Sequence, residues 1–190
     1  MVNQQQRRII LTGNPRIGKT TIIKRIISTA NDLSLAIAGI MTPEILDEGN
    51  RIGFQIVDLI SGKKEILASL ETKNNWDNKW KVGKYRVHPK AMEKIAIPAL
   101  RNAFENTTVD ILVIDEIGKM ELLSADFAAL AIEAFVNEKY GFSVLATLGR
   151  GIPRGFRINL DENFIENIRV EVSNRDSIAM DLQKWILRLA

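Results

Sequence analysis

The sequence predicts an α/β fold, with a doubly wound, mostly parallel sheet and a β-hairpin appendage. Segments with the apolar spacing of strands alternate with segments of helical spacing along the chain, which is typical of such sheets. The segment 110–114 carries a continuous apolar run, as expected for a strand that is buried on both faces. With 190 residues, of which 46% are hydrophobic, the chain can bury one core, and we expect a single domain over residues 1–190.

Composition narrows the class of protein further. The absence of cysteine excludes disulfides, thiolate nucleophiles and cysteine-based metal sites. The apolar runs fall short of the roughly 18 residues that span a bilayer, and the polar residues 1–8 precede no signal-peptide core. We therefore expect a cytoplasmic protein without a membrane partner. A net charge of +3 does not favour a nucleic-acid partner, although it leaves one open. Since no long exposed apolar stripe demands a partner, we expect a monomer.

The first half of the chain predicts a helix, a strand and a hairpin. Residues 18–30 have helical spacing, and residues 36–41 are typical of a strand. The apolar runs 50–59 and 65–68 flank a glycine-containing turn at 61–63, which predicts an antiparallel hairpin. Because a parallel sheet does not need a hairpin here, we place it at the sheet edge as an appendage.

Two tryptophans, Trp76 and Trp80, lie four residues apart in the polar segment 71–84. They can form a stacking platform for a base, or they can pin this segment onto the body of the domain. The second interpretation is favoured, because aromatic side chains readily bury large areas.

Residues 89–105 carry an apolar face at helical spacing. Pro98 lies inside this run and predicts a kink or a break, since proline lacks the N–H that a helix interior needs. His88 is the only histidine and directly precedes a proline. With no second histidine or cysteine nearby to complete a metal site, we interpret it as structural.

In the second half of the chain, segments typical of helices again alternate with segments typical of strands. Ser124 is placed as the N-cap of a helix with Asp126 in its first turn, and Gly141 is expected to end that helix. A strand follows at 142–147, and then a loop at 150–157 that is rich in glycine and arginine.

A short strand at 168–172 precedes the closing helix. The residues of this helix that are expected to face inward are Ile178, Leu182, Trp185, Ile186 and Leu189.

The motif G-x-x-x-x-G-K-[ST] follows the apolar run 9–11 and opens into a helix, which is the context in which it binds phosphates. Backbone N–H groups of such a loop and the helix N-terminus form a site for anions. Lys19 is expected to reach the β- and γ-phosphates, and the Thr20 hydroxyl to bind Mg²⁺. The loop therefore predicts binding of nucleoside triphosphates. Its residues are Gly13, Asn14, Pro15, Arg16, Ile17, Gly18, Lys19 and Thr20.

Asp115 and Glu116 follow the buried strand and supply the second half of the site. In proteins with this phosphate loop, a carboxylate at the tip of such a strand helps to hold Mg²⁺, a role that Asp115 fits together with Thr20. Glu116 is placed to orient a water molecule or accept its proton, while Lys19 offsets charge on the transferring phosphoryl group. This combination predicts hydrolysis. An Asn/Thr-Lys-x-Asp stretch, which reads guanine, does not occur, so we expect low base selectivity.

Two further features stay open at this point. Thr147 ends the next strand, where its hydroxyl contacts the γ-phosphate or attacking water, or forms an ordinary hydrogen bond of a strand end. Arg150, Arg154 and Arg157 supply a cation to the transition state or are surface charges.

Several short stretches together resemble the nucleoside-triphosphatase family called THEP1. The resemblance extends from about residue 9 to 147 and is strongest at Asp-Glu-Ile-Gly-Lys-Met-Glu-Leu, residues 115–122. Further matches are residues 11–21, 41–44 (Met-Thr-Pro-Glu), 51–54 (Arg-Ile-Gly-Phe), 82–85 (Val-Gly-Lys-Tyr), 97–100 (Ile-Pro-Ala-Leu) and, more loosely, 174–176 (Asn-Arg-Asp).

The resemblance implies a RecA/AAA-like P-loop NTPase fold and slow, Mg²⁺-dependent hydrolysis of ATP, GTP, CTP and UTP. It also implies two nucleotide-binding segments. The first is the phosphate loop, and the second comprises Ile111, Leu112, Val113, Ile114, Asp115, Glu116, Ile117 and Gly118. By the same resemblance, Lys84, Tyr85, Lys119 and Glu121 are expected near the phosphates.

The sequence departs from the family at two places. Arg16 stands where the family usually has glycine; its side chain lies over the phosphates or, as we favour, in solvent. The segment 149–157 is also richer in arginine and glycine than the family pattern.

Two other functions share these features. A nucleotide or small-molecule kinase uses the same loop and closes an arginine-rich lid, which 150–157 resembles. A nucleic-acid-stimulated ATPase is suggested by the arginines and the paired tryptophans. Against a kinase, Glu116 is placed to activate water.

Overall fold

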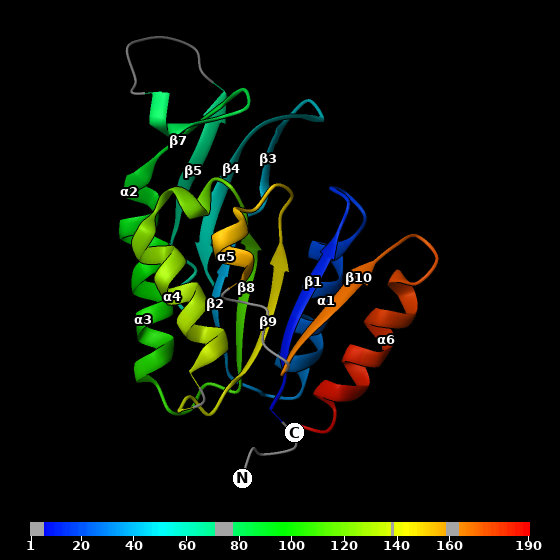
Figure 1. Cartoon of the computed structure of the whole chain (residues 1–190). Coiled ribbons are helices and arrows are strands. Elements are labelled where there is room, and N and C mark those ends of the chain that lie inside the picture. Colours follow the sequence, from blue (N-terminus) through cyan, green and yellow to red (C-terminus); the bar gives the residue numbers. More distant parts are fainter. Residues whose placement is uncertain (1–5, 71–77, 138, 159–163) are drawn as a thin grey trace.

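Ten strands form one sheet in the computed structural model, which describes residues 6–70, 78–137, 139–158 and 164–190 (Figure 1). The strand order is β10-β1-β9-β8-β2-β4-β5-β7-β6, and β3 pairs with β4 beside this path. The strands are β1 (Arg8–Gly13), β2 (Ile37–Met41), β3 (Glu44–Asp47), β4 (Asn50–Asp58), β5 (Lys64–Leu70), β6 (Lys81–Val82), β7 (Tyr85–Val87), β8 (Ile111–Ile117), β9 (Ser143–Leu148) and β10 (Ile165–Val170). The helices are α1 (Lys19–Asp32), α2 (Pro89–Ala91), α3 (Ile97–Glu105), α4 (Ala125–Val136), α5 (Arg154–Ile158) and α6 (Arg175–Ile186).

The half of the sheet from β10 to β2 is parallel and has helices on both faces. Helices α1 and α6 cover one face, and α3 and α4 cover the other (Figure 1). Alternate residues of β8 therefore enter different cores: Leu112 packs with α3 and α4, whereas Val113 packs with α1 and α6. Burial on both faces explains the continuous apolar run of this strand, and the doubly wound arrangement is as predicted.

The other half of the sheet is antiparallel and larger than the predicted appendage. The hairpin of β4 and β5 forms as expected, and β4 also pairs with β2 through Ile40↔Asp58 and Met41↔Val57. Strands β3, β6 and β7 extend this half. The short strands β6 and β7 were not predicted, because two or three residues are too few to show the alternation of apolar and polar residues that marks a strand.

The helix expected at 89–105 changes its winding rather than ending at Pro98. A π-helical segment, Met92–Ala96, joins α2 to α3, and Pro98 lies in the first turn of α3. Proline there removes one backbone donor and crowds the preceding carbonyls, and a π turn is a known way to accommodate such a disturbance.

Three expectations for the second half were wrong. The helix capped by Ser124 ends at Val136, five residues before Gly141, because Asn137 adopts an extended conformation. The segment predicted as a loop at 150–157 contains the short helix α5. The last strand also begins three residues and ends two residues earlier than expected, at Ile165–Val170. Of the two tryptophans, Trp76 lies outside the described residues, and Trp80 is half-buried in a 3₁₀ turn.

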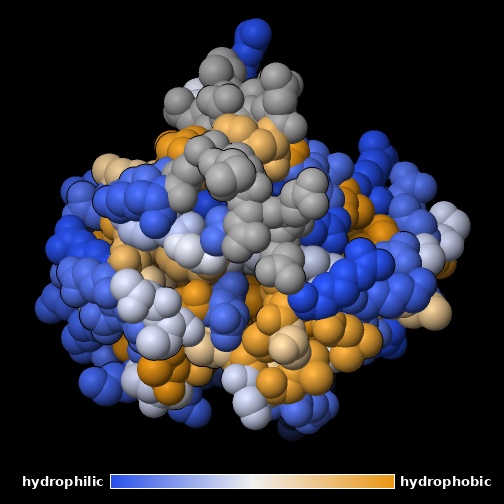
Figure 2. Space-filling model, turned by 90° about the horizontal axis from the view of Figure 1, so that it is seen from below, coloured by the Kyte–Doolittle hydropathy of each residue, from blue (hydrophilic) through white to orange (hydrophobic). Residues whose placement is uncertain are grey.

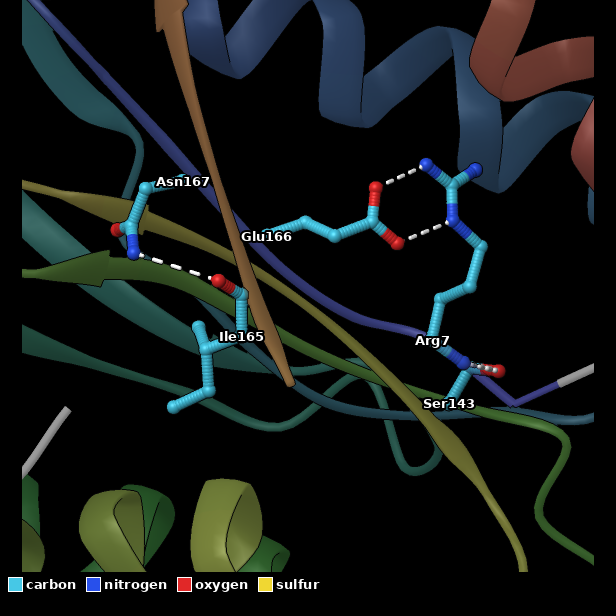
Figure 3. A network of polar contacts seen from close by, with 5 residues as sticks. All are labelled: Arg7, Ser143, Ile165, Glu166 and Asn167. Atoms are coloured by element: carbon cyan, nitrogen blue, oxygen red, sulfur yellow. Dashed lines mark hydrogen bonds and ion pairs between the residues drawn. The ribbon is translucent and has the colours of Figure 1, made fainter. Parts of the chain in front are cut away.

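Polar contacts of Arg7, the residue before β1, link the start of that strand to β10 and to β9. The guanidinium of Arg7 forms paired hydrogen bonds with the carboxylate of Glu166, the first of 2.6 Å, and the Arg7 backbone N–H donates to the Ser143 hydroxyl at 3.2 Å (Figure 3). Arg7 directly precedes β1, and Glu166 lies in β10, so these contacts join segments that are far apart in the sequence.

Figure 2 shows the end of the molecule at which β1 begins and the C-terminus lies. Hydrophilic residues cover much of this face, and hydrophobic residues are visible in several places, with the largest group below the grey atoms in this view. Within the described ranges, none of the helices combines the length and the apolar character needed to cross a bilayer. The expectation of a monomer stays a prediction.

Candidate active site

The phosphate loop connects the end of β1 to the first turn of α1, as the motif predicts. Gly13 has a φ of +138° and lies so close to β10 that a Cβ atom would meet the Val170 carbonyl oxygen at 2.5 Å. Gly18, at φ +115°, is the residue before α1. Only glycine adopts these conformations without strain, which explains both fixed glycines of the motif.

Lys19 is the first residue of α1 and is buried. Its ammonium group donates to the carbonyl oxygens of Gly13, at 3.3 Å, and Asn14, at 3.4 Å. The cation is thus held over the loop whose N–H groups are expected to bind phosphates.

Arg16 has a φ of +62°, a left-handed conformation that favours glycine. This is the position at which the resembling family usually has glycine. The residue is exposed and lines the cavity described next, so the position of its side chain in solvent stays a prediction.

A cavity of about 610 Å³ opens beside the phosphate loop. Loop and helix residues, the ends of β2 and β8, and the antiparallel half of the sheet all contribute to its wall. The lining residues are Pro15, Arg16, Gly18, Lys19, Thr20, Thr21, Lys24, Thr42, Pro43, Glu44, Leu46, Arg51, Phe54, Val82, Asp115, Glu116, Lys119, Met120, Glu121, Gly149 and Arg150. The structure thus brings the phosphate loop and the two predicted carboxylates to one cavity.

Asp115 is 3% exposed and accepts two hydrogen bonds from hydroxyl groups. Thr147 donates to its Oδ1 at 2.5 Å, and Thr20 donates to the same oxygen at 3.3 Å. Burial raises the pKa of Asp115, and the two hydrogen bonds act against that rise. Of the two interpretations of Thr147, the structure shows the hydrogen-bonded strand end, with the metal-binding candidate Asp115 as its partner.

Thr42 links the end of β2 to the end of β8 and was missed by the sequence argument. Its hydroxyl donates to the carbonyl of Asp115 and accepts from the backbone N–H of Glu116, both at 3.0 Å. The signal that could have found it is its place directly after a strand of the parallel half, since the carboxyl ends of parallel strands meet at one edge.

Glu116 is half-buried, and its carboxylate faces the backbone of two glycines. Its Oε1 would lie 3.0 Å from a Cβ on Gly118 and 2.9 Å from one on Gly149. Burial raises the pKa of Glu116, the charge of Lys19 lowers it, and the charge of Asp115 raises it. The glycines leave room for this carboxylate in the cavity wall.

Glu121 lines the same cavity with a fully buried carboxyl group. Burial and the neighbouring negative charge of Glu116 raise its pKa to about 8. Lys119 and Glu121 both line the cavity, and their expected position near the phosphates stays a prediction. Neither Lys84 nor Tyr85 is among the described lining residues. Tyr85 is buried, and Lys84 lies over its ring at 5.5 Å.

The three loop arginines have different surroundings. Arg150 lines the cavity and donates a hydrogen bond to the side-chain oxygen of Asn14 in the phosphate loop. Arg154 is exposed on α5. The side chain of Arg157 lies outside the described structure.

Of the second predicted nucleotide-binding segment, residues 111–118, only Asp115 and Glu116 line the cavity. The side chains of Ile111, Leu112, Val113 and Ile114 are fully buried in the sheet, as is that of Ile117. These residues place Asp115 and Glu116 at the sheet edge and do not themselves line the cavity.

The oxygen donors at the loop suit a hard divalent cation. Mg²⁺ takes one or two carboxylates or hydroxyls from the protein and completes its shell with water and substrate phosphates. The Thr20 hydroxyl and the Asp115 carboxylate lie next to each other beside the phosphate loop and fit this requirement.

Comparison with known proteins gives related sequences over nearly the whole chain. A family model described as NTPase matches residues 8–183. The nucleoside-triphosphatase THEP1 of Methanothermobacter thermautotrophicus is 38% identical over 131 residues, which cover 69% of this chain and 71% of that protein. The THEP1 of Methanocaldococcus jannaschii is 33% identical over 180 residues, which cover 95% of this chain and 97% of that protein.

Two solved structures share the fold. The crystal structure of THEP1 from Aquifex aeolicus has a TM-score of 0.75 and 32% identity, covering 92% of this chain and 96% of its own. The solution structure of a human cancer-related nucleoside triphosphatase has a TM-score of 0.77 and 29% identity, covering 96% of this chain and 98% of its own. These similarities confirm the predicted fold class.

Proposed function

Because this chain belongs to the NTPase family, among the nucleoside triphosphatases called THEP1, we propose that its cavity hydrolyses nucleoside triphosphates with Mg²⁺ and little base preference. The chain is an enzyme of the nucleoside-triphosphatase class. The observation that supports the site assignment is that Lys19 and Glu116 line the same cavity. A cation for the phosphates and a carboxylate for the attacking water are the two groups that hydrolysis needs.

The proposed reaction uses groups of this chain in three roles. The loop N–H groups and Lys19 bind the β- and γ-phosphates and offset their charge. Glu116 orients a water molecule toward the terminal phosphorus and accepts its proton. The new phosphorus–oxygen bond replaces the bond to the bridging oxygen, and the products are the nucleoside diphosphate and inorganic phosphate.

Thr20 and Asp115 are the residues that would hold Mg²⁺. When bound, Mg²⁺ neutralises charge on the β- and γ-phosphate oxygens. The hydroxyl of Thr147 holds the Asp115 carboxylate in place for this role.

We expect low base selectivity because the protein groups assigned to substrate binding are those that bind phosphates. The identified groups face phosphates rather than a base, and the sequence lacks the guanine-reading stretch. Binding through the phosphates alone gives similar affinity for each nucleotide.

The test is phosphate release from ATP, GTP, CTP and UTP, with Mg²⁺ and with EDTA. We expect rates within a few-fold across bases and loss of activity in EDTA. Glu116→Gln should lower turnover by about 10²–10⁴-fold, the usual contribution of a general base. Its affinity for a nucleoside diphosphate should change little, because the phosphate loop is intact.

Glu93→Gln, which removes an exposed carboxylate of the π-helical segment, is the matched control and should keep full activity. Undiminished turnover in Glu116→Gln would refute the role of Glu116. A parent chain that binds nucleotide, releases no phosphate and phosphorylates an added mononucleotide would show a kinase instead.

A further inference from the structure

Arg51 is a cation on the cavity wall with no role in the function proposed so far. It lies on β4, in the antiparallel half of the sheet, whereas Lys19 and Arg150 belong to the phosphate-loop side. Its side chain is 29% exposed. An arginine in this place either stabilises the sheet or serves a ligand in the cavity.

Three neighbours hold the guanidinium of Arg51 in one orientation. Its Nε donates to the Tyr85 hydroxyl at 2.9 Å, and its Nη1 donates to Glu44 at 2.5 Å. Its Cζ lies 5.0 Å from the ring centre of Phe54 and 5.6 Å from that of Tyr85. The two rings pack edge to face, 5.3 Å apart. Arginine loses much conformational entropy when it is ordered, so a guanidinium fixed by contacts of three kinds is pre-organised.

The chain connections place this group near the carboxyl end of β8. Thr42 binds the backbone of Asp115 and Glu116, and the next residue, Pro43, accepts a hydrogen bond from Gln55 of β4 at 3.0 Å. The hairpin of β3 and β4 extends past this end of the sheet and forms one wall of the cavity (Figure 1). Arg51 and Lys19 thus reach the cavity from different walls, and Asp115 and Glu116 line it too.

From this geometry we infer that Arg51 binds the terminal phosphate of the nucleoside triphosphate. The planar guanidinium suits phosphate oxygens, and a rigid support lets it stabilise the charge of the transferring group without reorganisation. Tyr85 and Glu44 are its positioning residues. The inference rests on the proposed function for its substrate, and it predicts a contact that a diphosphate does not make.

The test compares the binding of two ligands that differ by the terminal phosphate. Calorimetry with Mg²⁺ measures the affinity of β,γ-imido-ATP and of ADP for the parent and for Arg51→Gln. We expect Arg51→Gln to weaken triphosphate binding by about tenfold or more, a typical effect of losing one charge-assisted hydrogen bond. Binding of ADP should change less than twofold. Arg51→Lys should fall between the parent and Arg51→Gln.

Two further variants separate this contact from a structural role. Tyr85→Phe removes the hydroxyl that orients Arg51 but keeps the ring, and it should weaken triphosphate binding in the same selective way by a smaller factor. Lys64→Gln removes an exposed cation from the neighbouring β5 and should change neither affinity. Unfolding midpoints of all variants verify that they are folded.

Equal weakening of both ligands in Arg51→Gln, or no change in either, would overturn the inference. If Arg51→Gln does not fold, the same criterion applies to Tyr85→Phe. The binding experiment needs no turnover. A parent that binds the triphosphate through Arg51 but releases no phosphate would therefore refute the proposed hydrolysis and leave the Arg51 contact standing.

Discussion

Asp115 and Glu116 are adjacent in sequence but differ in surroundings. Asp115 is 3% exposed and accepts hydrogen bonds from Thr20 of α1 and Thr147 of β9. Glu116 is half-buried, faces glycine backbone and lines the cavity. A buried carboxylate is costly unless hydroxyls or cations compensate it. The fixed carboxylate therefore suits a metal, and the more accessible one suits water.

Glu121 should make the stability of the folded chain depend on pH. Its pKa is about 8 in the fold, against an ordinary value of 4.5. Between these values the folded state keeps a proton that the unfolded state has released. The stabilising contribution is therefore complete below about pH 4.5 and is lost as the pH rises toward 8. The limiting slope for one such group is about 1.4 kcal/mol per pH unit.

Urea unfolding of the parent and of Glu121→Gln, without nucleotide or metal, measures this effect. We expect the variant to gain stability relative to the parent as the pH rises from 4.5 to 8. Glu93→Gln should show no such trend. A difference between parent and Glu121→Gln that stays constant with pH would contradict the prediction.

Lys119 should contribute to turnover more than to nucleotide binding. Its side chain lies on the cavity wall against Gly151, where a Cβ atom would meet Lys119 Cε at 2.4 Å. Lys119→Ala should lower kcat by about tenfold, since one cation near the phosphates is lost. The Kd of ADP should stay within about threefold. Phosphate release and calorimetry measure the two quantities, and an unchanged kcat would exclude this role.

At the scale of elements, the side chains near a helix end predicted some of the observed helix boundaries and not others. Pro98 predicted a disturbed helix, and the disturbance takes the form of a π turn at Met92–Ala96. Ser124 predicted a helix start, and its hydroxyl accepts a hydrogen bond from the Phe127 N–H at 3.3 Å. Gly141 did not mark the helix end, because Asn137 turns the chain earlier. The start of α4 was predicted correctly because an N-cap residue such as Ser124 acts on backbone groups within one helical turn.

Ser124→Ala should destabilise the fold by about 1 kcal/mol, since it removes the N-cap of α4. Ser28→Ala is the matched control, an exposed serine in the interior of α1. It should be neutral or slightly stabilising, because alanine is the better helix former. Thermal or urea unfolding of both variants gives the comparison. Equal effects of the two substitutions would show that the Ser124 hydrogen bond adds nothing.

At the scale of the whole molecule, one sheet connects the parallel and antiparallel halves through the pairing of β2 with β4. The core on the α3 and α4 side includes residues from both halves, such as Ile56 of β4 and Ile114 of β8. A shared core favours unfolding as one unit, and the single domain stays a prediction that an unfolding experiment tests.

The tryptophans allow a test of this cooperativity. Trp185 belongs to α6 and packs in the same core as Val170 of β10, and Trp80 adjoins β6 at the other end of the sheet. In Trp76→Phe/Trp185→Phe, the fluorescence of Trp80 reports the antiparallel end, and in Trp76→Phe/Trp80→Phe, that of Trp185 reports the α6 end. In each variant, we expect the urea midpoint by fluorescence to coincide with that by far-UV circular dichroism. Separate midpoints would show two units that unfold independently.

The sequence by itself determined the phosphate loop, the carboxylate pair, the apolar strands that carry them and the α/β class. Each of these depends on short-range spacing, such as the glycines at 13 and 18 or the apolar run before Asp115. Only the tertiary structure decided that Thr147 and Thr42 hold the end of β8, and that Arg51 faces the same cavity as Lys19. These neighbours are set by strand order and by the extent of the antiparallel half. Both arise from long-range pairing, which leaves no periodic trace in the residues that take part.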